Sequence, residues 1–66
     1  MLLKIKAIRK AQRMSVQELA NATGLTSMSI YRYESGVRMP KFDDALRIAG
    51  ALGVEVTDLI ERKGTR

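Results

Sequence analysis

Two short helical patterns that meet at one glycine constrain this chain more than any other feature. Residues 15–36 read Ser-Val-Gln-Glu-Leu-Ala-Asn-Ala-Thr-Gly-Leu-Thr-Ser-Met-Ser-Ile-Tyr-Arg-Tyr-Glu-Ser-Gly. Ser15 and Glu18 have the spacing of a capping box, in which each side chain bonds the backbone N–H of the other residue. Gly24 supplies the left-handed backbone that ends the first helix, and Thr26 is a good N-cap for the second. Two helices around a tight turn are typical of a helix-turn-helix.

The flanking segments continue the helical pattern in both directions. Periodicity and capping residues predict five helices, over residues 2–13, 16–23, 27–35, 42–52 and 56–62. Lys41 is a poor cap for the fourth helix, and Asp43 and Asp44 in its first turn partly offset this through the helix dipole. No segment shows the alternation of a strand. We therefore expect an all-α, compact five-helix domain over residues 1–62, with a frayed tail at 63–66.

Apolar residues at helical spacing indicate which side chains form the core. We expect it to contain Ile5, Ile8, Met14, Leu19, Ala20, Leu25, Ile30, Phe42, Leu46, Ala49, Leu52, Val54, Leu59 and Ile60. A chain of 66 residues forms one domain at most and buries only about 60% of its unfolded surface, so it is marginally stable without a partner.

Composition excludes several classes of function. The chain has no Cys and no His, which excludes disulfides and zinc fingers and removes the commonest general base, so we expect no metal, cofactor or enzyme activity. Paired carboxylates could still catalyse, but the adjacent Asp43 and Asp44 diverge by about 100° on a helix. No apolar run approaches the roughly 18 residues of a membrane span, and the charged start lacks the pattern of a signal peptide. We expect a cytoplasmic protein with no membrane contact and no small-molecule ligand.

Positive charge is concentrated in the part of the chain that holds the helix-turn-helix. Residues 1–41 contain eight Lys and Arg and two acidic residues, a net charge of +6, whereas residues 42–66 carry −1. Phosphate binding is a sufficient reason for this asymmetry. A solvated basic surface with no partner is the alternative, and the helix-turn-helix pattern favours the first interpretation.

Residues along nearly the whole chain, from about Leu3 to Ile60, carry a family resemblance. The matching positions are Ile5, Ile8, Arg9, Ser15, Glu18, Leu19, Ala20, Gly24, Leu25, Thr26, Ile30, Tyr33, Glu34, Ser35, Gly36, Arg38, Pro40, Leu46, Ile48, Ala49, Ala51, Leu52, Gly53, Val54, Leu59 and Ile60. In this combined spacing the chain resembles the phage repressor/Cro-like (XRE) helix-turn-helix family. The resemblance implies a lambda-repressor-like five-helix domain that binds double-stranded DNA, usually as a dimer on a palindromic operator.

Helical spacing predicts which side chains of the second motif helix face outward. Leu25, Ile30 and Tyr33 point inward, and the outward residues are Ser27, Met28, Tyr31, Arg32 and Ser35. Ser27, Met28 and Arg32 match the base readers of the resembled family. Arg32 can form a bidentate pair with guanine O6 and N7, and Met28 offers apolar contact to a thymine methyl. Arg32 could instead clamp a phosphate, and Tyr31 could be either a packing residue or a sugar-phosphate contact.

Backbone contacts are expected from polar and cationic side chains around the motif, namely Arg9, Arg13, Thr26, Ser29, Tyr31, Arg38 and Lys41. Glu34 would repel phosphate if it were unpaired, so we expect it to pair with Arg9, as matching positions do in the family. The alternative is an exposed pair worth roughly 0–1 kcal/mol. Val16 stands where the family often has a phosphate-binding Gln, and it can offer only its backbone N–H.

Two functions from different classes fit these observations. The first is a transcription regulator, a repressor rather than an activator, that binds a palindromic operator through the major groove. The second is a protein-binding module that kept the fold, such as an antitoxin or the partner of an anti-repressor. Val54, Val56, Leu59 and Ile60 supply more apolar surface than a short terminal helix needs, so we expect a homodimer through the C-terminal helix, at least on DNA.

Overall fold

The helix-turn-helix forms as its capping residues predict. In the computed structural model, which describes residues 2–61, helix α2 spans Val16–Thr23 and helix α3 spans Ser27–Ser35. The Ser15 Oγ accepts from the Glu18 N–H at 3.0 Å, and the Glu18 carboxylate accepts from the Ser15 N–H at 2.8 Å. Gly24 ends α2 with φ +76°, a left-handed conformation that L side chains rarely adopt. These local bonds therefore confirm both helices and the turn between them.

The first helix is shorter than predicted at both ends. Helix α1 spans Ile5–Ala11, and strand β1, Leu2–Leu3, precedes it. Arg13 has a positive φ of 57°, which stops the helix before residue 13. The side chain of Gln12 contacts the end of the fourth helix, where its Nε2 donates to the Leu52 carbonyl at 2.6 Å.

The predicted fifth helix is replaced by one 3₁₀ turn and a strand. Turn η1 covers Val56–Leu59, and strand β2, Ile60–Glu61, pairs antiparallel with β1. The Lys4 N–H also donates to the Leu59 carbonyl at 2.6 Å. β-branched residues such as Val56 and Ile60 favour extended backbone, and pairing with the start of the chain supplies the hydrogen bonds that an added helical turn would have made. The expected end at residue 62 and the tail at 63–66 lie outside the described residues.

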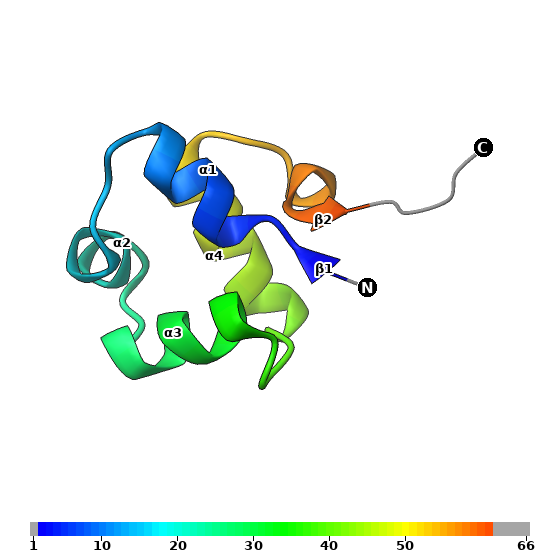
Figure 1. Cartoon of the computed structure of the whole chain (residues 1–66), viewed down its shortest axis with the longest axis horizontal. Helices are drawn as coiled ribbons and strands as arrows, with labels where there is room; N and C mark the ends of the chain where they lie inside the picture. The colour runs from blue at the N-terminus through cyan, green and yellow to red at the C-terminus, as the bar shows by residue number, and fades with distance from the viewer. Residues whose placement is uncertain (1, 62–66) are drawn as a thin grey trace.

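Helix α4 forms over Phe42–Leu52 as predicted, with no side-chain cap at Lys41. Within residues 2–61 the domain thus has four α-helices, not five, together with η1 and one two-stranded pair. Figure 1 shows α3 along one edge of the molecule and the β1 and β2 ends side by side, away from α2. Over the same residues no helix is long and apolar enough to cross a membrane.

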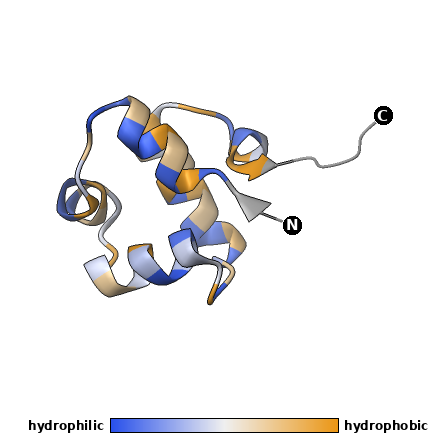
Figure 2. Ribbon diagram, in the orientation of Figure 1, coloured by the Kyte–Doolittle hydropathy of each residue, from blue (hydrophilic) through white to orange (hydrophobic). Residues whose placement is uncertain are grey.

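One hydrophobic core joins the four helices and η1. Each helix carries both hydrophilic and hydrophobic residues, as expected of amphipathic helices around a shared interior (Figure 2). The buried apolar residues are Ile5, Val16, Leu19, Ala20, Ile30, Tyr33, Ile48, Ala49, Leu52 and Leu59. Ile8, Met14, Leu25 and Val54 are half-buried against them.

Three residues expected in the core are exposed instead. The exposed fractions are 67% for Phe42, 45% for Leu46 and 36% for Ile60. Helix α4 carries apolar residues on more than one face, and the face that contains Ile48 turns inward. Periodicity alone does not say which of two apolar faces is covered. As a result, Phe42 and Ile60 lie on an exposed apolar surface that is separate from the core.

Candidate nucleic-acid interface

The outer face of α3 is available to a ligand. Met28 and Tyr31 are 58% and 57% exposed, and Arg32 beside them is also exposed. On the inner face, Ile30 and Tyr33 are buried. The predicted division of this helix into an inner and an outer face is therefore confirmed.

An ion pair ties the end of α3 to α1. The Arg9 Nε donates to Glu34 Oε2 at 2.6 Å, and Arg9 Nη2 donates to Oε1 at 3.1 Å. Arg9 Nη1 donates to the Met14 carbonyl at 2.8 Å. The side chains of Arg9 and Glu34 are only 9% and 5% exposed, so the alternative of an exposed surface pair is wrong. The hydrogen bond to Glu34 is the main cause that raises the pKa of Arg9, against the opposing effect of burial.

This pairing gives Arg9 a different position from the one expected of a phosphate contact. All three guanidinium nitrogens donate to groups within the protein, and the residue as a whole is 7% exposed. Arg9 therefore joins α1, the following loop and α3, and it presents little surface to a DNA strand in this conformation.

A second contact fixes α3 against α4. The Tyr33 hydroxyl donates to Asp44 Oδ2 at 2.7 Å, and Tyr33 is 6% exposed. This hydrogen bond, followed by burial and by the charge of Asp44, raises the pKa of Tyr33 above its usual value, although Arg38 opposes the shift. The helical period predicts that Tyr33 lies inside but does not identify its partner, because Asp44 lies in another helix and its place in the first turn of α4 indicates only a helix-dipole role.

Gln17 is a residue of the surface that sequence analysis missed. The Ser27 Oγ donates to Gln17 Oε1 at 3.0 Å, and Gln17 Nε2 donates to Asn21 Oδ1 at 3.0 Å. The second residue of α2 thus touches the first residue of α3. No local pattern predicts this contact, because it depends on the angle between the two helices.

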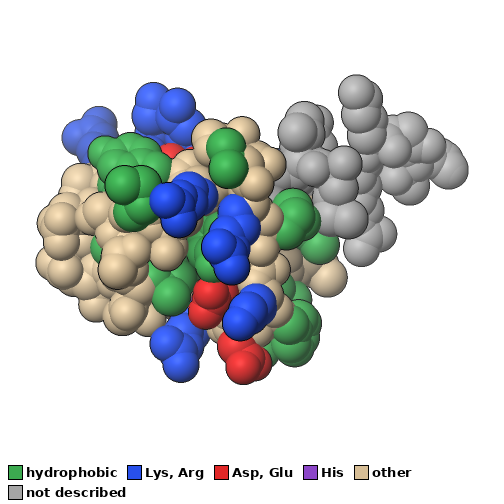
Figure 3. Space-filling model, turned by 90° about the horizontal axis from the view of Figure 1, so that it is seen from below, with side chains coloured by type: hydrophobic (Ala, Val, Ile, Leu, Met, Phe, Trp, Pro, Cys, Tyr) green, Lys and Arg blue, Asp and Glu red, His purple; other side chains and the backbone are tan. Residues whose placement is uncertain are grey.

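The remaining candidate backbone contacts surround α3. Thr26 caps the helix by accepting from the Ser29 N–H at 3.1 Å, and its hydroxyl donates to Ser29 Oγ at 3.0 Å, which leaves the Ser29 hydroxyl hydrogen for another acceptor. Arg13, Arg38 and Lys41 are exposed. Figure 3 shows the side of the molecule on which α3 lies: Lys and Arg side chains are spread across it, and the acidic side chains are fewer. Val16, by contrast, is buried in the core.

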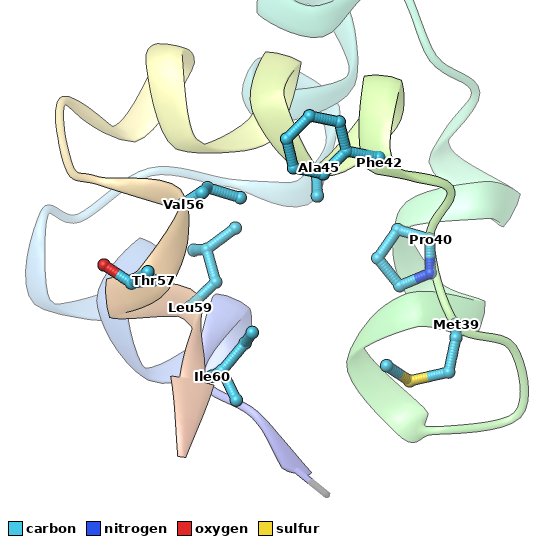
Figure 4. A pocket seen from close by; sticks show the side chains of 8 residues that line it. All are labelled: Met39, Pro40, Phe42, Ala45, Val56, Thr57, Leu59 and Ile60. Atoms are coloured by element: carbon cyan, nitrogen blue, oxygen red, sulfur yellow. The ribbon is translucent and has the colours of Figure 1, made fainter. Parts of the chain in front are cut away.

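An apolar groove of about 390 Å³ lies where α4 meets η1 and β2. Figure 4 shows its lining, with Val56, Thr57, Leu59 and Ile60 along one side, Met39 and Pro40 along the other, and Phe42 and Ala45 between them. The groove has no charged side chain in its lining. Among the described side chains, those of residues 4–60, His, Cys, Asp and Glu form no cluster of three or more that could hold a metal ion.

Comparison with protein families identifies a match over most of the chain. The sequence model of the helix-turn-helix family matches residues 5–59. A Methanocaldococcus jannaschii protein named for an HTH-type transcriptional regulatory role is 35% identical over 57 residues. That alignment covers 86% of this chain but only 18% of the relative.

Solved structures share the same fold. The restriction-modification controller protein C.AhdI from Aeromonas hydrophila is 28% identical, with a TM-score of 0.83 and 86% of both chains covered. A chain of the SinR–SinI protein complex is 26% identical, with a TM-score of 0.84, over 92% of this chain and 60% of that one. ComR from S. thermophilus, solved with DNA and its signalling peptide ComS, is 32% identical, with a TM-score of 0.82, over 97% of this chain and 22% of that one.

Proposed function

The chain belongs to the helix-turn-helix family of DNA-binding transcription regulators, and we propose that it represses transcription from a twofold-symmetric operator, with α3 in the major groove. The observation that carries the proposal is the exposed outer face of α3 on a helix held at both ends. Arg9–Glu34 and Tyr33–Asp44 fix its C-terminal half, and the Thr26 cap fixes its start. A rigid helix can present side chains to base edges without an ordering cost at binding.

Base reading is assigned to Arg32, Met28 and Ser27. Arg32 donates to guanine O6 and N7, Met28 packs on a thymine methyl, and Ser27 bonds a base edge. Gln17 belongs to the same set because it touches Ser27 at the entrance to the groove. These four side chains lie on the first and middle turns of the motif helices, the part of the fold that reaches bases in this docking mode.

Backbone phosphates are assigned to cations and hydroxyl groups that flank the outer face. The exposed ones are Arg13, Thr26, Tyr31, Arg38 and Lys41, and the half-buried Ser29 belongs with them. Such contacts set register and orientation and carry no sequence information. Arg9 is not assigned to a phosphate, because its three guanidinium nitrogens donate to groups within the protein. Its role is to fix the position of α3.

A second copy of the chain is the proposed occupant of the apolar groove. Phe42 and Met39 at its rim are 67% and 51% exposed, and the lining offers no charge for a polar ligand. Half-sites read by a symmetric dimer lie about 34–36 Å apart. The dimer therefore forms through α4, η1 and β2 rather than through a fifth helix.

Binding-site selection from random DNA, followed by a salt series on the selected and a scrambled duplex, tests the proposal. Arg32→Ala weakens the preferred site by about 1–3 kcal/mol, relaxes one base position and changes scrambled DNA far less. Arg38→Ala and Lys41→Ala weaken both duplexes alike and reduce the salt slope by about 0.9 per phosphate lost. A stoichiometric protein partner, with no salt-sensitive DNA binding, would instead identify the chain as a protein-binding module.

A further inference from the structure

A second, smaller cleft opens between α1 and α3. It has a volume of about 150 Å³ and is lined by Lys6, Arg9, Tyr31, Glu34 and Ser35. We infer that this cleft holds one backbone phosphate of the bound DNA, with Lys6 Nζ and the Tyr31 hydroxyl as its donors. The inference rests on the proposed insertion of α3 into the major groove, and it adds Lys6 of α1 as a DNA contact that the sequence did not indicate.

The size and charge of the cleft suit a phosphate group. Its volume of about 150 Å³ leaves room for a tetrahedral anion, since a site needs only about 10–15 Å³ by the same measure to hold one water molecule. Glu34 does not repel the anion strongly, because both its oxygens accept from Arg9 and its side chain is only 5% exposed. With that pair neutralised, the net charge of the lining is that of Lys6.

The donors follow from the hydrogen bonds already made. The Ser35 Oγ donates to the Arg32 carbonyl at 3.2 Å, so its hydrogen is not available to a ligand. Tyr31 is 57% exposed, and Lys6 is exposed and forms no ion pair with the side chains of residues 4–60. An ammonium group and a phenol are therefore the groups that this cleft offers to an acceptor.

The cleft lies next to the outer face of α3, so a DNA strand bound to that face would pass over the cleft. Ser27, Tyr31 and Ser35 are spaced four residues apart and form one ridge of α3, so the cleft borders the proposed base-reading face. A helix with side chains is about 10–12 Å across, and the major groove is about 12 Å wide. When α3 fills the groove, the residues beside it meet the phosphates of the groove wall. On the side of Tyr31, that neighbour is α1 with Lys6.

Lys6→Ala tests the inference, with Lys4→Ala as a matched control. Lys4 is an exposed lysine two residues earlier that does not line the cleft. Lys6→Ala weakens binding to operator and scrambled DNA alike, by about 3- to 10-fold, and lowers the salt slope by about 0.9. Lys4→Ala leaves the slope unchanged. Tyr31→Phe weakens binding several-fold with no change of slope, because it removes a neutral donor.

Phosphate ethylation interference identifies the single phosphate that the cleft holds, which a general loss of charge would not do. In each half-site, ethylation of that phosphate weakens DNA binding by the wild-type protein. The same ethylation has no further effect on DNA binding by Lys6→Ala. Thermal unfolding of each variant confirms that the fold is intact. If Lys6→Ala keeps the wild-type slope and interference pattern while Arg38→Ala lowers the slope, the cleft holds no phosphate and the proposed function stands. If the wild-type protein binds no DNA, both proposals fail.

Discussion

At the scale of single residues, the buried Arg9–Glu34 ion pair joins α1 to the C-terminal end of α3. Glu34→Gln leaves the Arg9 guanidinium buried without its counter-charge, which costs about 3 kcal/mol of unfolding free energy. A domain of this length is stable by only about 3–10 kcal/mol, so the loss is visible in urea unfolding and in DNA affinity.

The double variant Arg9→Met/Glu34→Gln is the matched comparison, because it also removes the buried guanidinium charge that Glu34→Gln leaves without a partner. The double variant is expected to lose less stability than the two single variants together. Fully additive losses in stability and in DNA binding would show that the two side chains act independently, and the role assigned to Arg9 would then be wrong.

The buried hydroxyl of Tyr33 predicts how the unfolding free energy depends on pH. Its pKa is raised in the folded protein, so its contribution to stability is fully present below the unfolded value of about 10 and is lost as the pH rises through the folded value. Tyr33→Phe lowers the unfolding free energy at pH 7 by about 1–2 kcal/mol and flattens its decline above pH 10. Tyr31→Phe, on the exposed face, leaves stability at pH 7 unchanged. Equal pH profiles for wild type and Tyr33→Phe would contradict this assignment.

At the scale of elements, Arg13 is the strained point between α1 and α2. Its φ of 57° suits glycine, so Arg13→Gly raises the unfolding free energy by about 0.5–1 kcal/mol, after allowance for the greater freedom of glycine in the unfolded chain. Thermal or urea unfolding measures the gain.

Arg13→Ala separates backbone strain from charge. It removes the same positive charge as Arg13→Gly but keeps a Cβ in the left-handed conformation, so it brings no gain in stability. Both variants lose the same DNA affinity and the same salt slope if Arg13 contacts a phosphate. Equal stabilities for the two variants would mean that the strain at this turn is negligible.

At the scale of the whole molecule, the groove between α4 and η1 decides how two copies meet. Phe42→Gln keeps the monomer folded, since the side chain is 67% exposed, but removes the largest apolar group at the groove rim. We expect its binding to a single half-site to match that of the wild-type protein, and its cooperative binding to a palindromic operator to be lost. Sedimentation with both duplexes measures the difference.

Val37→Gln is the control for this experiment. Val37 is 77% exposed and does not line the groove, so the substitution removes a similar apolar surface elsewhere. Dimer formation on the palindrome is expected to survive it. A Phe42→Gln protein that still binds the palindrome as a cooperative pair would place the dimer contact on another surface.

The sequence was sufficient wherever a structure depends on neighbours along the chain. The Ser15–Glu18 capping box, Gly24 and Thr26 each satisfy backbone groups within a few residues, so α2, α3 and their turn could be placed from spacing alone. The outward face of α3 followed from the helical period for the same reason. The Arg9–Glu34 pair was expected from the repulsion of a lone carboxylate beside DNA together with the family resemblance, although its burial was not.

Only the tertiary structure decided what depends on contacts between distant segments. Pairing of the two chain ends turned the predicted fifth helix into η1 and β2, because β1 and β2 are joined by hydrogen bonds that no local window contains. The packing of α4 decided that Ile48 is buried and Phe42 is exposed. The sequence by itself thus determined the helix-turn-helix and its outer face, whose hydrogen bonds and periodicity are local. The apolar groove and the cleft beside Lys6 exist only because separate helices pack at particular angles, which local hydrogen bonding leaves undetermined.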